Sequence, residues 1–264
     1  MLLTKFKLIR LMSGILETAN FLFLKLLFKK PQNIRLFPGR IFRNYMSLVG
    51  QDKWLCKSIF ELFPGISGKR IILEHLTGEG IETPLDELAY LALITAVKKP
   101  ENIFEIGTFR GRTALNFALN SPENCTVYTM DLPPNNKNDV LEEAGKNDKL
   151  IIKKSEPDIE YKGKGVEYKI KQIYGDSTKF DFSPYYGKMD IVFIDGAHHY
   201  NAVIIDTKNA IKMIKQDGVI IWHDFAIYGD YNDVTRAVLD CIPSNRIIQI
   251  DSTTIAIYFP NPNS

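Results

Sequence analysis

The chain has 264 residues, of which 45% are hydrophobic and 24% charged, as in a globular protein with a substantial core. Its net charge of +2 is too balanced to indicate nucleic acid as a partner. The three cysteines, Cys56, Cys125 and Cys241, are far apart and odd in number, which argues against a disulfide framework and a cysteine metal site. These totals favour one large α/β domain, or one domain plus an appendage, in a reducing cytoplasm.

Residues 1–80 are predicted to form an N-terminal extension of helices and loops. Residues 1–30 are rich in Leu, Ile and Phe but carry scattered Lys and Arg, so they lack the run of about 18 uncharged apolar residues that a spanning helix needs. Two interpretations stay open: a helix that packs on the domain or on a second copy of the chain, or a basic helix lying on an anionic membrane surface. Residues 31–70 read as a loop-rich connector with one short helix near 54–62.

From residue 83 onward, predicted helices and strands alternate. Thr83 is expected to cap a helix with Pro84 at its first position, and the helix should end before Pro100. Seven apolar segments then read as strands: one beginning at residue 103, followed by 125–131, 170–174, 189–195, 219–224, 246–250 and 254–258. Residues 216–218 are predicted to turn the chain. The nearly continuous apolar runs are typical of strands buried on both faces by helices.

The segment 103–113 is a predicted strand, glycine turn and helix. Gly107 and Gly111 stand four residues apart, and Thr113 opens a stretch of helical composition. Glycine lets a backbone approach a ligand closely, and a helix N-terminus offers free N–H groups. An ordinary strand-to-helix turn would show the same pattern, so the segment needs support from elsewhere in the chain.

Acids at the ends of the other strands give that support. Glu105, Asp131, Asp195 and Asp224 lie at predicted carboxyl ends, and Asp176 follows the third strand after one glycine. Ligands of open α/β sheets bind at this edge, and carboxylates gathered there are costly to bury unpaired. The acids therefore indicate a binding site along the carboxyl edge.

The first half of this edge fits a nucleoside cofactor. Asp131 is placed to hold two ribose hydroxyls, while Asp176 and Ser177 lie one strand further out, toward an adenine. The G-x-x-x-G spacing of Gly107 and Gly111 differs from a dinucleotide fingerprint, which favours an adenosine with a charged amino-acid tail over NAD. Glu105 is the candidate for the ammonium of that tail.

The second half carries Asp195, His198, His199, His223 and Asp224. Asp195 and Asp224 are candidate ligands for Mg²⁺, and His223 as a third ligand would favour a softer ion such as Mn²⁺. A cation there would lower the pKa of a substrate hydroxyl. Asp195, His198 or His199 is the candidate base, although either histidine could instead cap or pack at the start of the next helix.

Residues 133–169 interrupt the alternation of strands and helices. The segment begins with two prolines and ends in a flexible basic stretch around Gly163 and Gly165. It reads either as a solvated insertion or as a lid or substrate-binding wall.

Together these motifs resemble class I S-adenosylmethionine-dependent methyltransferases, in particular the branch of macrocin-type and cephalosporin-type O-methyltransferases. The segments that carry the resemblance are FEIGTFRGRT (104–113), YTMD (128–131), GDS (175–177), FIDGAHHY (193–200) and GVIIWHD (218–224). The resemblance implies a Rossmann-like, doubly wound seven-stranded sheet of order 3-2-1-4-5-7-6, with the last-but-one strand antiparallel, over residues 81–264. It also implies S-adenosylmethionine as the cofactor, bound by Glu105, Gly107, Gly111, Thr113, Asp131, Asp176 and Ser177, and Asp195 and Asp224 as metal ligands.

The expected activity is O-methylation of a sugar or another small polar metabolite. Two alternatives remain at this stage. One is an NAD-dependent oxidoreductase on a similar sheet, and the other is a non-catalytic binding protein attached to a membrane through residues 1–30.

Overall fold

The computed structural model describes residues 54–76, 82–133, 159–226 and 232–261. The expectations for residues 1–53, and for most of the insertion (134–158), lie outside the described residues.

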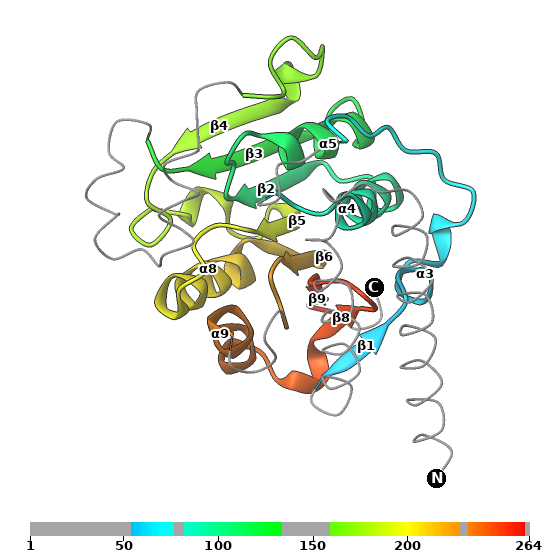
Figure 1. The fold of residues 1–264 in the computed structure, drawn as a ribbon. Helices are drawn as coiled ribbons and strands as arrows, with labels where there is room; N and C mark the ends of the chain where they lie inside the picture. The colour runs from blue at the N-terminus through cyan, green and yellow to red at the C-terminus, as the bar shows by residue number, and fades with distance from the viewer. Residues whose placement is uncertain (1–53, 77–81, 134–158, 227–231, 262–264) are drawn as a thin grey trace, which may run out of the picture.

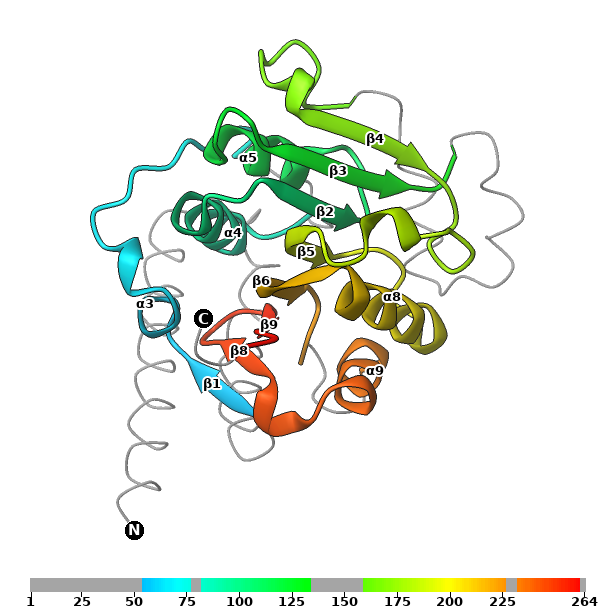
Figure 2. The same ribbon diagram turned by 180° about the vertical axis from the view of Figure 1, so that it is seen from behind.

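Within the described residues, eight strands form one sheet in the order β1-β8-β9-β6-β5-β2-β3-β4 (Figures 1 and 2). Strand β9 runs antiparallel to both of its neighbours, and the other pairs are parallel. The seven predicted strands keep their predicted order, and the antiparallel strand is where it was expected. The eighth strand, β1, was not predicted, and it adds an edge next to β8. The strands are β1 (Leu55–Lys57), β2 (Asn102–Ile106), β3 (Thr126–Asp131), β4 (Ile170–Tyr174), β5 (Met189–Ile194), β6 (Ile214–Trp222), β8 (Ile248–Ile250) and β9 (Ala256–Tyr258).

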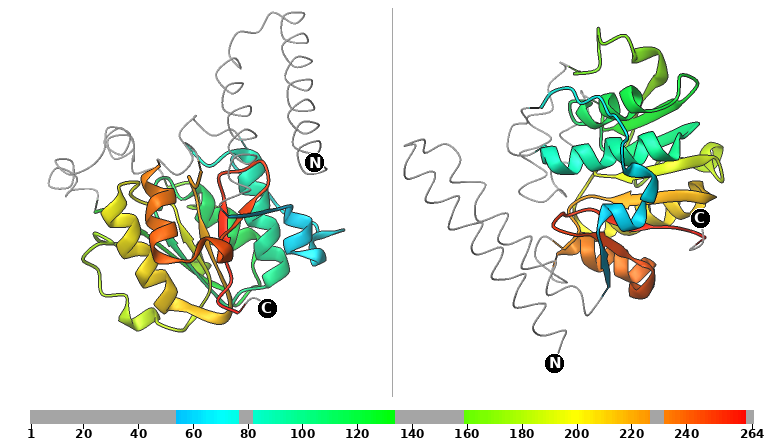
Figure 3. Two further views of the ribbon diagram at one scale, coloured as in Figure 1. Left: turned by 90° about the horizontal axis from the view of Figure 1, so that it is seen from below. Right: turned by 90° about the vertical axis from the view of Figure 1, so that its right-hand side faces the viewer.

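Helices cover both faces of this sheet, as the apolar strands predicted. Helices α4 (Leu85–Lys98) and α5 (Arg112–Asn120) lie on one side, and α8 (Tyr200–Met213) and α9 (Asp233–Cys241) lie on the other (Figures 1 and 3). Alternate residues of β2 show why: Ile103 packs in the core under α4 and α5, while Phe104 packs in the core under α8. Because side chains alternate along a strand, an all-apolar strand needs two such cores.

Three local predictions were wrong. The helix expected over 54–62 is a strand, β1, followed by a one-turn helix, α3 (Ile59–Leu62), which Ser58 caps. Helix α4 begins at Leu85 with Pro84 as its N-cap, so Thr83 is not the cap. The turn expected at 216–218 lies inside β6, where the register shifts against β5.

The register of the parallel strands fixes the level of the site. Ile106 of β2 pairs with Met130 of β3 and with Ile194 of β5, and Ile194 pairs with Trp222 of β6. The residues that follow these four in the chain therefore stand in one row along the carboxyl edge of the sheet: Gly107, Asp131, Asp195 and His223.

Candidate active site

Gly107 is a glycine because the chain itself crowds it. Its φ is +106°, and a Cβ there would lie 2.1 Å from the carbonyl oxygen of Asp195. The Asp195 N–H donates to the carbonyl of Ile106 over 2.8 Å, and the Gly107 N–H donates to the carbonyl of Met130 over 2.8 Å. The close approach at Gly107 is thus between three strand ends, and it fixes the glycine turn against the end of β5.

Gly111 meets a different part of the chain, the end of the insertion. Its φ is +80°, and a Cβ there would lie 2.6 Å from the ring of Tyr161. The Glu160 N–H donates to the Arg110 carbonyl over 2.8 Å, and the Arg110 side chain lies 3.5 Å from the Glu160 carboxylate. The described end of the insertion therefore packs directly on the glycine turn.

Asp131 ties together the loops that follow β2 and β3. Its carboxylate accepts the N–H of Phe109 over 2.6 Å and the N–H of Leu132 over 2.7 Å. The residue is half-buried at the strand end. A carboxylate oriented by two backbone donors is held rigidly, which suits the predicted contact with a pair of hydroxyls.

Glu105 lies one layer below the turn and is completely buried. Thr129 donates to its Oε2, whereas no hydrogen bond from the described residues reaches its Oε1. Burial raises the pKa of Glu105 well above its usual value, against the effect of the Thr129 bond. Behind Thr129 a chain of bonds continues through Thr108 (2.7 Å) and Gln172 (3.0 Å) to the hydroxyl of Tyr161 (3.0 Å). This network links Glu105, below the glycine turn, to the end of the insertion.

Asp176 and Ser177 follow β4, as predicted. Asp176 accepts bonds from the N–H and the hydroxyl of Thr178 (2.9 and 2.6 Å) and lies 3.1 Å from the Lys179 ammonium. Burial works in the opposite direction, but these bonds outweigh it and lower the pKa of Asp176. Ser177 interacts with Asp206, a fully buried acid of α8. Burial raises the pKa of Asp206 to about 7, and the charge of Asp176 adds to the rise.

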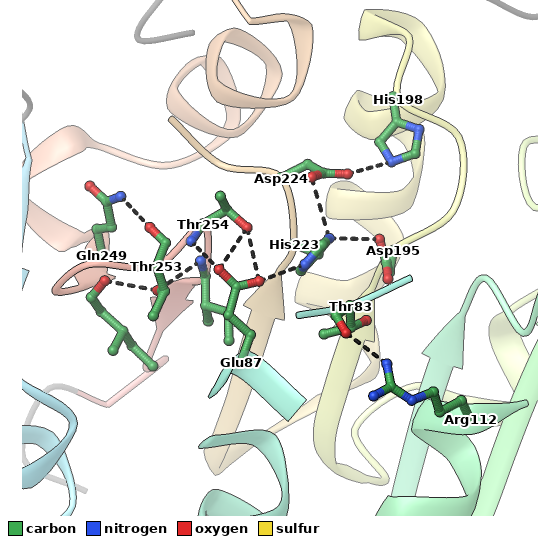
Figure 4. A network of polar contacts seen from close by, with 12 residues as sticks. Thr83, Glu87, Arg112, Asp195, His198, His223, Asp224, Gln249, Thr253 and Thr254 are labelled. Atoms are coloured by element: carbon green, nitrogen blue, oxygen red, sulfur yellow. Dashed lines mark hydrogen bonds and ion pairs between the residues drawn. The ribbon is translucent and has the colours of Figure 1, made fainter. Parts of the chain in front are cut away.

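The acids that follow β5 and β6 gather with a histidine in a half-exposed cluster. Asp195, His198 and Asp224 each offer one ligand atom, and these atoms lie within 4.8 Å of one another (Figure 4). His198 Nε2 is 2.7 Å from Asp224 Oδ2. Asp224 has a φ of +57°, an uncommon backbone conformation that tends to be found at functional sites. Two carboxylates and an imidazole fit a divalent cation of the Mg²⁺ to Mn²⁺ range.

His223 stands behind this cluster rather than in it. Its side chain is 9% exposed, its Nε2 is 2.8 Å from Glu87 Oε2, and its Nδ1 is 3.1 Å from Asp195 Oδ1 and 3.4 Å from Asp224 Oδ1 (Figure 4). Burial alone would lower the pKa of His223, but the two aspartates outweigh it and raise the pKa well above its usual value. With both ring nitrogens facing carboxylates, His223 is not arranged as a ligand. The set expected from the sequence, with His223 as its third member, changes to one with His198.

Two further predicted residues occupy helix starts. His199 is the N-cap of α8, and its Nδ1 accepts the Ala202 N–H over 3.4 Å, which is the capping alternative left open above. Thr113 lies half-buried in the first turn of α5, whose N-cap is Gly111.

Sequence reasoning missed Glu87 and Asp206 as residues of functional interest. Glu87 reads as an acid that favours the start of a helix, and Asp206 as a polar residue of a later one. Helical spacing was the available signal: Glu87 shares a face with Leu88, Leu91 and Ile94, all of them buried. An acid within an apolar stripe needs a buried partner.

Comparison with known proteins finds similarity to methyltransferases. Residues 104–225 match the family model described as a methyltransferase domain. The chain is 24% identical over 149 residues to an Arabidopsis thaliana protein named as a caffeoyl-CoA O-methyltransferase; the match covers 56% of this chain and 57% of the relative, less than two thirds of its length.

Two solved structures are also similar. One is an SAH-bound methyltransferase from Podospora anserina, with 15% identity, coverage of 68% of this chain and 80% of that one, and a TM-score of 0.49. The other is the O-methyltransferase TomG from Streptomyces achromogenes in complex with SAM, with 13% identity, coverage of 79% and 98%, and a TM-score of 0.48.

Proposed function

Since the chain contains a class I S-adenosylmethionine-dependent methyltransferase domain, we propose that it transfers the methyl group of that cofactor to a hydroxyl oxygen of a sugar or another small polar metabolite. One observation carries the proposal. The strand register sets the glycine turn in the same row as Asp131 on one side and Asp195 on the other. A donor held over the turn would have a ribose contact on its outer side and an acid cluster on its inner side.

On the cofactor side, Asp131 would accept bonds from the two ribose hydroxyls. Asp176 and Ser177 would meet the adenine, and the buried Glu105 would favour the ammonium of the methionine tail. The free N–H groups at the start of α5, near Thr113, suit its carboxylate. The turn from Gly107 to Gly111 would lie beneath the cofactor.

On the acceptor side, the reaction is an in-line displacement. An acceptor oxygen forms a bond to the methyl carbon as the bond from that carbon to sulfur breaks, and the acceptor proton passes to a base. His198 is our candidate for the base, because Asp224 lies 2.7 Å from its Nε2 and would stabilise the imidazolium that forms. Asp195 is the second candidate. Positioning of the two reactants supplies much of the acceleration in such a step.

A divalent cation fits the same cluster. Asp195, His198 and Asp224 would hold it, with His198 then a ligand rather than the base, and its chemistry there would be to lower the pKa of a bound acceptor hydroxyl. Titration with Mg²⁺ and Mn²⁺ tests this role: unchanged activity and unchanged thermal stability would contradict it.

We propose that the insertion forms a wall of the acceptor site, and that residues 81–264 form the catalytic domain. Packing of residues 159–161 on Gly111 supports the first point, because it places the end of the insertion beside the cofactor turn. Strand β1 comes from the predicted extension and joins the sheet, so we expect part of that extension to fold with the domain.

Among the described residues, no helix is long and apolar enough to cross a membrane. Contact of residues 1–30 with a membrane surface or with a second copy of the chain stays a prediction, as does the cytoplasmic location. Sedimentation with anionic liposomes, comparing the full chain with one that lacks residues 1–30, tests membrane contact. Equal sedimentation of the two would contradict it.

Calorimetry tests the cofactor assignment. We expect the wild type to bind S-adenosylmethionine and not NAD, and Asp131→Ala to lose most of the affinity. Asp217→Ala is the matched control, because Asp217 is an exposed acid near the opposite end of β6. Failure of the wild type to bind, or unchanged binding by Asp131→Ala, would contradict the assignment, and binding of NAD instead would favour an oxidoreductase.

A further inference from the structure

Glu87 is a fully buried acid for which the proposed function has no role so far. It lies in the first turn of α4, and its carboxylate contacts residues just before β9 and just after β6. Its Oε1 accepts the N–H of Thr254, just before β9, over 2.7 Å, and the Thr254 hydroxyl lies 3.2 and 3.1 Å from its two oxygens. Its Oε2 is 2.8 Å from Nε2 of His223. A buried acid is costly unless its oxygens are used, and here both are.

The contact with His223 fixes the direction of the imidazole ring. With Nε2 directed at Glu87, Nδ1 can only face the opposite way, toward Asp195 and Asp224 (Figure 4). Imidazole rings in metal and catalytic sites are oriented in this manner by an acid on the far nitrogen. In this protein the oriented ring faces two carboxylates rather than a metal ion or a substrate.

The ring divides the oxygens of the acid cluster into two sets. Nδ1 of His223 lies 3.1 Å from Oδ1 of Asp195 and 3.4 Å from Oδ1 of Asp224. The other oxygen of Asp224, Oδ2, faces His198 over 2.7 Å. The two Oδ1 atoms thus lie next to His223, and Oδ2 of Asp224 lies next to His198 on the half-exposed side.

We propose that Glu87 is a positioning residue that holds His223 against Asp195 and Asp224, and thereby decides which carboxylate oxygens are left for a cation or an acceptor hydroxyl. The inference rests on the proposed function for the role of the cluster. It makes His223 a competitor of the cation for these oxygens. Weakening the hold of Glu87 on the ring should therefore strengthen cation binding.

Glu87→Gln is the variant that separates this role from a purely structural one. Glutamine keeps the volume but has one acceptor oxygen, which the Thr254 N–H requires. The amide N–H₂ then faces Nε2 of His223, so the ring can no longer donate there. Thr254→Val is the matched control, because it removes a hydroxyl contact of Glu87 while leaving the backbone bond and the His223 contact in place.

Two readouts that need no methyl transfer test the proposal. In proton–nitrogen NMR spectra, assigned with His223→Gln, we expect a hydrogen-bonded proton on Nε2 of His223 in the wild type and in Thr254→Val, and its loss in Glu87→Gln. In Mn²⁺ titrations followed by electron paramagnetic resonance, we expect Glu87→Gln and His223→Gln to bind Mn²⁺ about tenfold more tightly than the wild type, through loss of a charge-assisted donor. Thr254→Val should bind like the wild type.

A double variant shows whether Glu87 acts through His223. If it does, Glu87→Gln adds nothing to His223→Gln, whereas additive effects would overturn the proposal. Two other results would overturn it as well. One is that Glu87→Gln and the wild type bind Mn²⁺ equally, or that neither binds it. The other is that Glu87→Gln keeps the Nε2 proton of His223. Binding of S-adenosylmethionine is measured in parallel: if it persists while these results fail, the positioning role falls and the proposed function stands.

Discussion

Replacing Asp206 by asparagine is expected to change how the stability of the fold depends on pH. Asp206 is fully buried on α8, where it interacts with Ser177. Burial raises its pKa from 3.8 to about 7 against the effect of the Ser177 hydrogen bond, and the charge of Asp176 adds to the rise. The folded protein therefore keeps a proton on this acid that the unfolded chain releases near pH 4.

The sign and the size of the effect follow from that difference. Between about pH 4 and pH 7 the folded state binds one more proton than the unfolded state, so the free energy of unfolding falls as the pH rises. A pKa that rises from 3.8 to about 7 corresponds to about 4 kcal/mol lost over this range, at about 1.4 kcal/mol for each pH unit. An asparagine side chain does not ionise, so Asp206→Asn should gain about that much relative to the wild type between pH 4 and pH 8.

Urea unfolding at several pH values measures this directly. Trp54 and Trp222 are buried, and Trp222 donates to Thr207 beside Asp206, so fluorescence reports on the relevant core. Asp217→Asn, at an exposed position, serves as the control. If the difference in the free energy of unfolding between Asp206→Asn and the wild type stays constant from pH 4 to pH 8, Asp206 does not hold this proton. The absolute size of that difference does not affect this conclusion.

Two other substitutions test the geometry of the turn. Gly107→Ala places a Cβ 2.1 Å from the Asp195 carbonyl, so we expect a loss of more than about 3 kcal/mol in urea unfolding, whereas Gly163→Ala, at a position with φ of +72° in open space, should cost about 1 kcal/mol. Equal costs would show that backbone conformation alone accounts for Gly107. Thr129→Val removes the donor to buried Glu105 and should destabilise the fold by about 1–3 kcal/mol. Its cost should grow as the pH rises through the raised pKa of Glu105, because the variant raises that pKa further and so penalises the charged form, and a cost that shrinks with pH would argue against a buried carboxylate there.

The strands themselves were predictable because they are buried on both faces, whereas their order in the sheet followed from the resemblance to methyltransferases. Continuous apolar runs identify such strands, and the acids at their ends mark the carboxyl edge before any coordinates are known. Strand β1 was missed since its sequence, Leu-Cys-Lys, is too short for a periodic signal, and pairing with β8 rather than local propensity makes it a strand.

The site was predictable as a set of residues but not as a set of contacts. The sequence places Asp195, His198, His223 and Asp224 at one edge. It cannot say that His198 lies next to Oδ2 of Asp224 while His223 lies next to the Oδ1 atoms of both aspartates. That arrangement depends on Glu87, which is over a hundred residues away in the chain. The glycine at 107 is a similar case, because the atom that excludes a side chain there belongs to Asp195.

The most direct test of the proposed methyl-donor site is a crystal structure of the chain soaked with S-adenosylhomocysteine. We expect the ribose on Asp131, the adenine beside Asp176 and Ser177, and the sulfur above the turn on the side of Asp195. An S-adenosylhomocysteine molecule bound elsewhere, or one that leaves Asp131 without a contact, would contradict the assignment of this edge of the sheet to the cofactor.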